Sequence, residues 1–187
     1  MAAFAVVGCG GDASSGTDSL PPPEVEAAPE APTATTTSTG SLSEDDRAQV
    51  EQAVHDYIAA LDAHDAAAVC ALFAPGALEL SELPVRSEGC AGSLGASIGV
   101  RPKGGAPAWK RTVIRALNDV SVGQGRARVT ATVTHNFADR KFVSIEEDVI
   151  YLDRVGGRWL LAKPSGTLYR AVGYAEPPIR ALTPPQR

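Results

Sequence analysis

The chain has 187 residues, of which 44% are hydrophobic and 5% aromatic, and its formal net charge is −5. This length suits one domain with tails, and the acidic balance argues against a general nucleic-acid binder, which would carry a basic surface. No apolar run approaches the roughly 18 residues that a membrane span needs.

Charge and composition separate the first part of the chain from the rest. The first basic residue is Arg47, and eight of the 22 acidic residues precede it. Residues 10–43 have no aromatic side chain and combine a proline-rich stretch with a Thr/Ser/Ala run. Such a segment cannot bury enough apolar surface to offset the entropy of ordering. We therefore expect a flexible, acidic tether over residues 10–43.

Residues 1–9 end in Val6-Val7-Gly8-Cys9, which resembles a bacterial lipobox. The resemblance implies a signal-peptide remnant, a lipid on Cys9, and a protein that is anchored on the outer face of the cell membrane or secreted. The segment lacks the basic start of a secretory signal, so an ordinary apolar N-terminus with an incidental cysteine is the alternative.

The chain has three cysteines, and if Cys9 is the anchor, Cys70 and Cys90 remain as a pair. An exported domain lies in an oxidising compartment, where a disulfide between these two would persist. Two free thiols are the alternative for a cytoplasmic protein. The pair is accompanied by no Cys-x-x-Cys spacing and no clustered histidines, so we expect no metal site.

The folded body is expected over residues 44–166 and begins with helices. Ser43 followed by Asp46 is a weaker relative of the capping box. Apolar residues then recur at helical spacing, which predicts a helix from 44 to about 63. Asp65 caps a second helix that stops before Pro75-Gly76, and a third, short helix is expected over 87–98.

From Trp109 onward the hydrophobic period changes from 3.6 to 2, which predicts strands joined by turns at 123–125, 139–140 and 156–157. Helices followed by consecutive hairpins predict an α+β domain, with three N-terminal helices packed on an antiparallel sheet. Residues 167–187 form a C-terminal extension that we expect to be partly disordered, with an edge strand over 168–174 as an alternative.

This order of elements resembles the nuclear-transport-factor-2-like superfamily, which includes ketosteroid isomerases and SnoaL-like polyketide cyclases. The likeness lies in Tyr57-Ile58-Ala59-Ala60-Leu61-Asp62-Ala63-His64-Asp65, in Ala71-Leu72-Phe73-Ala74, and in Gly156-Gly157 followed by Trp159. It covers roughly residues 44–166. The resemblance implies a curved sheet wrapped against the helices, leaving a conical pocket, and the family has lipid-anchored, disulfide-bearing members.

The resemblance also implies site residues. Tyr57 stands where ketosteroid isomerases have an oxyanion-hole tyrosine, and Asp148 where they have a protonated aspartate. The position of the base falls near Ser81, whose hydroxyl cannot abstract a carbon-bound proton at neutral pH. Glu79 and Glu82 are close in sequence, but a one-residue slip in a strand reverses the face of a side chain. The missing base weakens the isomerase interpretation.

Each candidate has a plain structural explanation as well. Tyr57 lies on the apolar face of its helix, where a core tyrosine with a hydrogen-bonded hydroxyl is expected. Asp148 belongs to an acidic run, Glu146-Glu147-Asp148, that suits a solvated strand. His135 lies on the apolar register of its strand, where a neutral ring can donate from one nitrogen and accept at the other.

We expect a binding or accessory module at the cell envelope, leaning away from catalysis. Its ligand would be a small, largely apolar molecule held by Tyr57, His135 and Asp148 as candidate polar contacts, without a cofactor or nucleic acid. We expect the protein to contact the membrane only through its lipid anchor. A second copy of the chain, bound through the sheet as a homodimer, is a further expected partner. One alternative is a SnoaL-like or isomerase-like enzyme acting on a small apolar carbonyl substrate. Another is a structural, partner-binding domain with a filled pocket.

Overall fold

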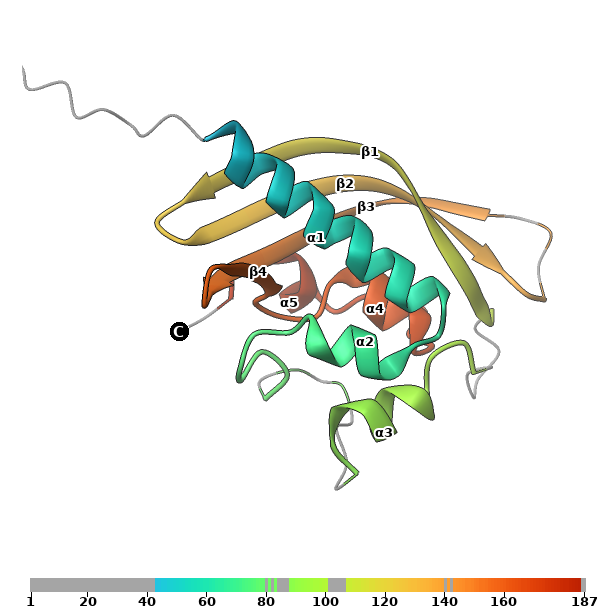
Figure 1. The fold of residues 1–187 in the computed structure, drawn as a ribbon. Coiled ribbons are helices and arrows are strands. Elements are labelled where there is room, and N and C mark those ends of the chain that lie inside the picture. The colour runs from blue at the N-terminus through green and yellow to red at the C-terminus, as the bar shows by residue number, and fades with distance from the viewer. Residues whose placement is uncertain are drawn as a thin grey trace, which may run out of the picture. The chain divides into compact units, whose positions relative to one another are not determined.

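The computed structural model describes residues 43–79, 81, 83, 88–100, 107–139, 141 and 143–185. Cys9, the tether expected before Ser43, and Glu82 lie outside these residues. Figure 1 shows the described part as helices set against a single sheet. Among its helices none is both long and apolar enough to cross a membrane, and within the same ranges no group of His, Cys, Asp and Glu side chains could hold a metal ion.

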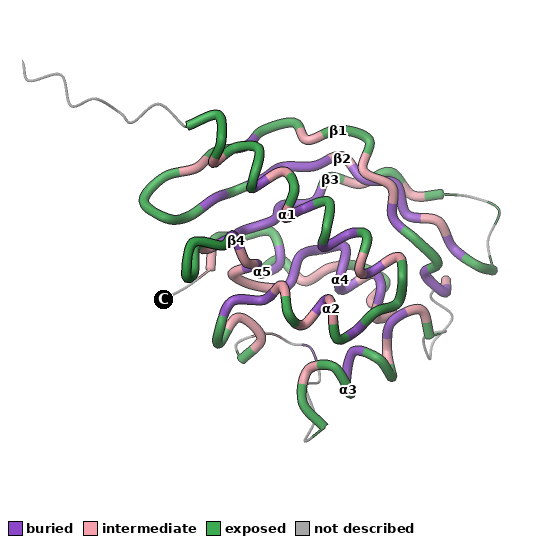
Figure 2. The backbone as a smooth tube through the Cα atoms, in the orientation of Figure 1, coloured by how far each residue is buried: buried purple, intermediate pink, exposed green. Residues whose placement is uncertain are grey.

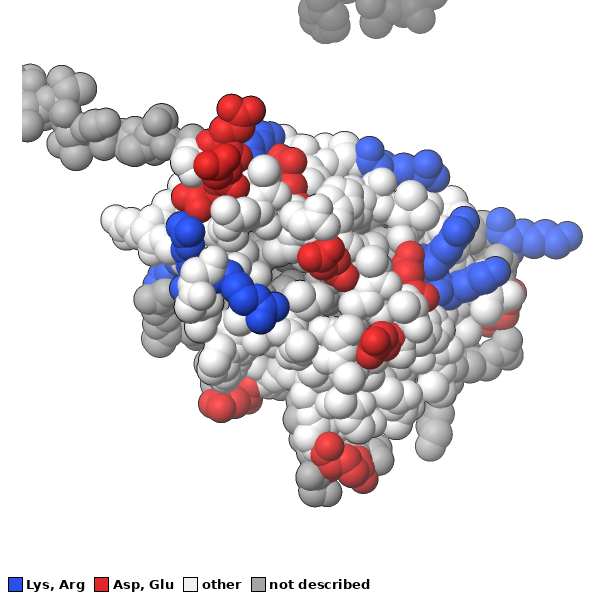
Figure 3. Space-filling model, viewed as in Figure 1, with Lys and Arg blue, Asp and Glu red and all other residues white. Residues whose placement is uncertain are grey.

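Helix α1 (Glu44–Asp62) forms as its periodicity predicts. The Ser43 side chain accepts a hydrogen bond from the backbone N–H of Asp46 at 3.0 Å, which satisfies one of the free amides of the first turn. Acidic side chains gather over that turn (Figure 3), where they complement the positive end of the helix dipole. The buried positions of the helix (Figure 2) are those with helical spacing: Val50, Val54, Tyr57, Ile58 and Leu61.

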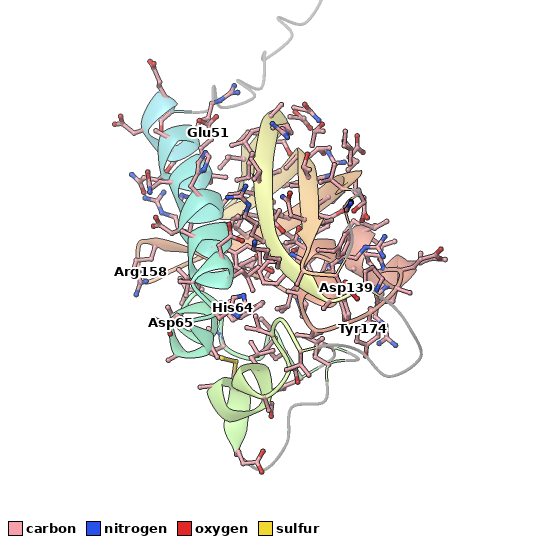
Figure 4. The ribbon with its side chains drawn as sticks, turned by 90° about the vertical axis from the view of Figure 1, so that its right-hand side faces the viewer. Glu51, His64, Asp65, Asp139, Arg158 and Tyr174 are labelled. Atoms are coloured by element: carbon pink, nitrogen blue, oxygen red, sulfur yellow. A yellow bond between two sulfur atoms is a disulfide. The ribbon has the colours of Figure 1, made fainter. Side chains whose placement is uncertain are left out.

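The end of α1 is fixed by His64, whose φ of 56° is left-handed. The backbone N–H of Asp65 donates to the carbonyl of Ala60 at 3.1 Å, as in a helix that ends with a left-handed residue. The His64 ring stacks on Trp109, with the ring centres 5.5 Å apart. This contact brings the end of α1 against the first strand (Figure 4) and offsets part of the cost of the left-handed backbone.

Two short helices, α2 (Ala66–Ala71) and α3 (Gly89–Gly95), follow. Asp65 caps α2 by accepting from the backbone N–H of Ala68 at 2.9 Å, as the sequence predicts. A disulfide between Cys70 and Cys90, with the Cα atoms 6.0 Å apart, joins α2 to α3 (Figure 4). The expected cysteine pair is therefore confirmed.

The sheet is antiparallel throughout, in the order β1-β2-β3-β4. Its strands are β1 (Trp109–Gly123), β2 (Arg126–Phe137), β3 (Val143–Val155) and β4 (Arg158–Leu161). The β1–β2 and β3–β4 turns each place two successive residues at positive φ, the geometry that matches the twist of a hairpin. Helices followed by hairpins thus give the expected α+β fold.

One face of the sheet carries the core. On β2, Val129, Ala131, Val133 and His135 alternate along this inner face and are at most 1% exposed. On β3 the opposite positions are the even-numbered ones, including Asp148 and Ile150. Register shifts interrupt the β1–β2 pairing at three places, and such bulges bend a strand and increase its twist.

After β4 the chain returns to this inner face and forms α4 (Gly166–Ala171) and then α5 (Ile179–Leu182). Thr167 and Leu168 are completely buried, so the boundary expected at residue 166 falls within the core packing. The edge strand over 168–174 is wrong. The outer edge of β4 is already paired, because Leu161 exchanges backbone hydrogen bonds with Leu72 and Ala74 at 2.8 and 2.9 Å.

Candidate functional site

The Tyr57 side chain points from the middle of α1 into the core and is fully buried. Its hydroxyl shares a hydrogen bond of 3.1 Å with the hydroxyl of Ser165, the residue before α4. Its ring meets that of Phe73 edge to face, 6.4 Å between centres. Burial raises the pKa of Tyr57 well above its ordinary value, so the phenol stays protonated.

Asp148 lies on the inner face of β3 and is 2% exposed, so its expected place in a solvated strand is wrong. One carboxylate oxygen accepts from the backbone N–H groups of Val149 and Gly166 at 2.8 and 2.9 Å. The other accepts from the N–H and the hydroxyl of Thr167 at 2.9 and 2.6 Å. Both oxygens are therefore occupied in holding the first turn of α4, where the free amides of a helix favour a carboxylate.

His135 is 1% exposed and lies in a chain of polar contacts on the same face. Trp109 donates from its indole N–H to the Thr112 hydroxyl oxygen at 3.0 Å, and that oxygen is 2.8 Å from His135 Nδ1. His135 Nε2 is 3.7 Å from a carboxylate oxygen of Glu146, which in turn pairs with Arg170 of α4 at 2.7 Å.

These contacts favour one tautomer of His135. The Thr112 hydroxyl accepts from Trp109, so its own proton is available for the Nδ1 lone pair. The ring proton then sits on Nε2 and faces the Glu146 carboxylate, whereas the other tautomer would bring a lone pair toward the negative charge. Burial lowers the pKa of His135 below its ordinary value, against the opposing effects of the Glu146 and Asp148 charges.

The three candidate residues therefore surround α4 and the residue before it. The Asp148 charge raises the pKa of both Tyr57 and His135, which places the three within electrostatic reach of one another. Their hydrogen bonds, however, go to other groups, four of which belong to residues 165–167. Residues 165–167 thus occupy the polar groups of Tyr57 and Asp148, and the conical pocket that the resemblance implied stays a prediction.

A cavity with a volume of about 560 Å³ lies elsewhere in the described residues. Three segments form most of its wall: residues 74–81, residues 162–164 after β4, and residues 180–185 around the end of α5. Asp153 and Tyr169 line it as well. Ser81, which stands near the base position implied by the resemblance, lines it, and its hydroxyl donates to the carbonyl of Leu78 at 2.7 Å. This volume falls in the range of small-molecule sites.

Lys163 is the half-buried cation of this cavity wall. Its ammonium donates to the backbone carbonyls of Arg180 and Thr183 and lies 4.8 Å from the centre of the Tyr151 ring. Burial lowers the pKa of Lys163 to about 8, an effect that the more distant Asp148 charge opposes. The lysine therefore ties the C-terminal segment to the end of the sheet while it brings a positive charge to the cavity.

Sequence reasoning missed Lys163, Arg180 and Asp153, the charged side chains among the described residues that line the cavity. No local motif marks them, because the wall combines residues 74–81 with segments of the C-terminal part of the chain, more than 70 residues further on. The available signal was indirect: a proline stands within or beside each segment, as at Pro75 and Pro164, where the chain leaves regular structure.

No protein-family model and no curated protein sequence matches the chain. Solved structures are similar to it. An NTF-2-like protein of unknown function from Shewanella oneidensis is 11% identical, with a TM-score of 0.40 over 62% of this chain and 93% of that one. A ketosteroid isomerase-like protein from Erwinia carotovora atroseptica is 16% identical, with a TM-score of 0.40 over 64% of this chain and 93% of that one. TsrD from Streptomyces laurentii is 17% identical, with a TM-score of 0.41 over 68% of this chain and 97% of that one. At these identities and scores, the similarity assigns neither a family nor an activity.

Proposed function

We propose that this protein is a small-molecule-binding module whose ligand site is the cavity between residues 74–81, 162–164 and 180–185. The observation that carries the proposal is the cavity itself, about 560 Å³ with alanine and proline side chains and a few charged groups in its wall. Mostly apolar concave sites with a few convergent polar groups are typical of ligand pockets.

Catalysis by Tyr57, His135 and Asp148 is less well supported. Both oxygens of Asp148 are committed to the start of α4, and the Tyr57 hydroxyl is bonded to Ser165. A general base must reach the proton that it abstracts, and these groups face residues of their own chain. An isomerase-like or SnoaL-like reaction at this place would require α4 to move away.

Ligand binding is tested by titrating isotope-labelled protein with a neutral apolar probe, octanol, and following the amide resonances. We expect shifts concentrated in the three cavity segments. The variant Ala77→Phe, which places a large ring in the cavity wall, should abolish them, whereas Ala116→Phe at an exposed position of β1 should leave them unchanged. Absence of binding, or shifts centred on Tyr57, His135 and Asp148, would refute the cavity as the site.

We further propose that the chain is a member of the nuclear-transport-factor-2-like superfamily. Supporting this, the segment from Tyr57 to Asp65 runs from the middle of α1 through its left-handed end to the cap of α2. Trp159 follows the hairpin turn onto β4 and is buried in the core. A solved structure of this chain, superposed on members of known activity, would test the assignment.

Export and lipid anchoring through Cys9 are part of the same proposal, and the disulfide between Cys70 and Cys90 supports an oxidising compartment. Intact-mass analysis of membrane-associated protein should give a multiply acylated form that begins at Cys9, since one acyl chain anchors only marginally. An unmodified Cys9 still preceded by Met1 would contradict this setting.

A homodimer through the sheet remains a prediction. Val143 and Ile145, on one face of β3, are 47% and 69% exposed and are the apolar side chains that such a contact would cover. Sedimentation equilibrium distinguishes a monomer from a dimer, and Ile145→Lys should abolish any dimer that uses this face.

A further inference from the structure

We propose that the ligand of this cavity is an apolar molecule that ends in a carboxylate, bound with the carboxylate beside Lys163. The inference rests on the proposed binding function, because it names the ligand class of the same cavity. Three features lead to it: the apolar wall, the arrangement around the Lys163 ammonium, and the balance of charge in the lining.

The wall offers an apolar body little opportunity for hydrogen bonding. Small aliphatic side chains make up most of it, including Ala77, Pro164, Ala181 and Pro184. Burying apolar surface against them contributes about 25 cal/mol for each Å² removed from water. Prolines also lack a backbone N–H, so the wall presents fewer donors than another loop of this length would.

The Lys163 ammonium supplies the polar end of the site. Its near partners in the described part of the chain are uncharged: two backbone carbonyls and the Tyr151 ring. An ammonium has three N–H donors, and the two carbonyls take two of them, which leaves one for a ligand oxygen. A half-buried cation whose contacts are neutral groups is stabilised when an anion approaches it.

The remaining charges of the lining favour an anion as well. Arg180 and Asp153 also line the cavity, so among the described residues of the wall, Lys163 included, two are cations and one is an anion. Asp153 lies 3.9 Å from Arg126, a cation outside the lining, which further offsets its negative charge. Asp148 affects Lys163 only over a longer range, since both of its oxygens are bonded to α4 and its neighbour.

The test compares three probes with the same eight-carbon chain: octanoate, octanol and octylamine. Titrations at pH 7 should show octanoate binding about tenfold more tightly than octanol, as one charge-assisted hydrogen bond would give, and octylamine more weakly than either. Lys163→Gln should remove the preference for octanoate. The matched control Lys110→Gln changes an exposed lysine on β1 and should retain it.

A pH series provides a second measurement that needs no variant, in case Lys163→Gln loosens the C-terminal segment. The preference for octanoate should fall as pH rises from 7 to 9, because Lys163, with a pKa of about 8, loses its charge in that range. Octanol affinity should stay constant. Equal binding of octanoate and octanol at pH 7 would overturn the carboxylate inference and leave the binding function intact, whereas binding of none of the probes would overturn both.

Discussion

Asp148 has the contacts of a structural residue, and its substitution distinguishes a structural role from a functional one. Its two oxygens accept four hydrogen bonds, three of them from Gly166 and Thr167 at the start of α4. In Asp148→Asn one oxygen becomes an NH₂ group that faces donors, so at least one buried N–H loses its acceptor. We expect the free energy of unfolding, measured in urea, to fall by roughly 2–4 kcal/mol.

A matched variant, Thr167→Val, distinguishes the loss of the Asp148 charge from the loss of one hydrogen bond to it. Thr167→Val removes the hydroxyl donor and keeps the side-chain shape and both backbone donors, so it should cost less, roughly 1–2 kcal/mol. If Asp148→Asn is as stable as the parent protein, the carboxylate does not hold α4. The catalytic interpretation of Asp148 would then deserve a second test.

His135 should make stability depend on pH. Burial lowers its pKa in the folded protein, while the unfolded chain binds a proton near the ordinary value of about 6.5. Below that pH the unfolded state holds more protons, so the free energy of unfolding should fall as pH decreases, by up to about 1.4 kcal/mol per pH unit. Urea unfolding between pH 7.5 and 5.5 measures this slope.

The control for this slope is His135→Asn, which keeps an amide near the Thr112 hydroxyl but does not titrate. The other histidines and the surrounding charges of Glu146, Asp148 and Arg170 are the same in both proteins, so the difference between the slopes belongs to His135. Identical slopes would show that His135 gains its proton as readily in the folded protein as in the unfolded chain.

At the residue scale, the sequence predicted positions better than environments. The strand period placed His135 on the inner face, and the helix period placed Tyr57 in the core. The acidic run around Asp148 predicted a solvent-exposed side chain. Nothing local reveals that α4 returns to this face and donates three hydrogen bonds to the Asp148 carboxylate. Partners that lie 18 or 19 residues away are set by tertiary structure.

At the scale of elements, α4 depends on the absence of a side chain at its first residue. A Cβ built on Gly166 would lie 2.9 Å from a carboxylate oxygen of Asp148, which cannot retreat without losing its bonds. Gly166→Ala should therefore lower the free energy of unfolding by about 1–3 kcal/mol, despite the better helix propensity of alanine.

Gly95 offers the matched comparison, because it ends α3 and its added Cβ would meet Ala66 at an ordinary 3.7 Å. Gly95→Ala should be neutral or stabilising by up to about 1 kcal/mol. Thermal and urea unfolding of the two variants measure the contrast. Equal effects of the two substitutions would show that the contact between α4 and Asp148 is loose.

The same contrast explains which elements could be predicted. Helix α1 is 19 residues long with a regular apolar period and a capping serine, so its own sequence specifies it. Helix α4 has six residues, Gly-Thr-Leu-Tyr-Arg-Ala, too few for a helical period to appear. Short isolated helices are marginal in water. Helix α4 therefore depends on tertiary contacts: the hydrogen bond from Gly166 to Asp148 and the one between Tyr57 and Ser165, the residue before the helix.

At the scale of the whole molecule, the buried polar groups around α4 differ from those of the cavity in whether their hydrogen-bonding capacity is used up. The interior groups around α4 satisfy one another, and the cavity beside β4 keeps a cation that contacts neutral groups. Groups that are fully paired stabilise a fold, and groups with remaining capacity are available to a ligand. This difference is why the proposed function rests on the cavity, which no motif in the sequence marks.

The disulfide should contribute to the stability of this domain because it joins α2 to α3 across a sequence separation of 20. Closing a loop of that length restricts the unfolded chain, and the chain-entropy model gives about 3 kcal/mol. Reduction should lower the free energy of unfolding in urea by about this amount. The double variant Cys70→Ser/Cys90→Ser should show the lower stability with or without reductant, which excludes other effects of the reductant. If reduction leaves the parent protein unchanged while thiol counting shows both cysteines free, packing alone holds α3 in place.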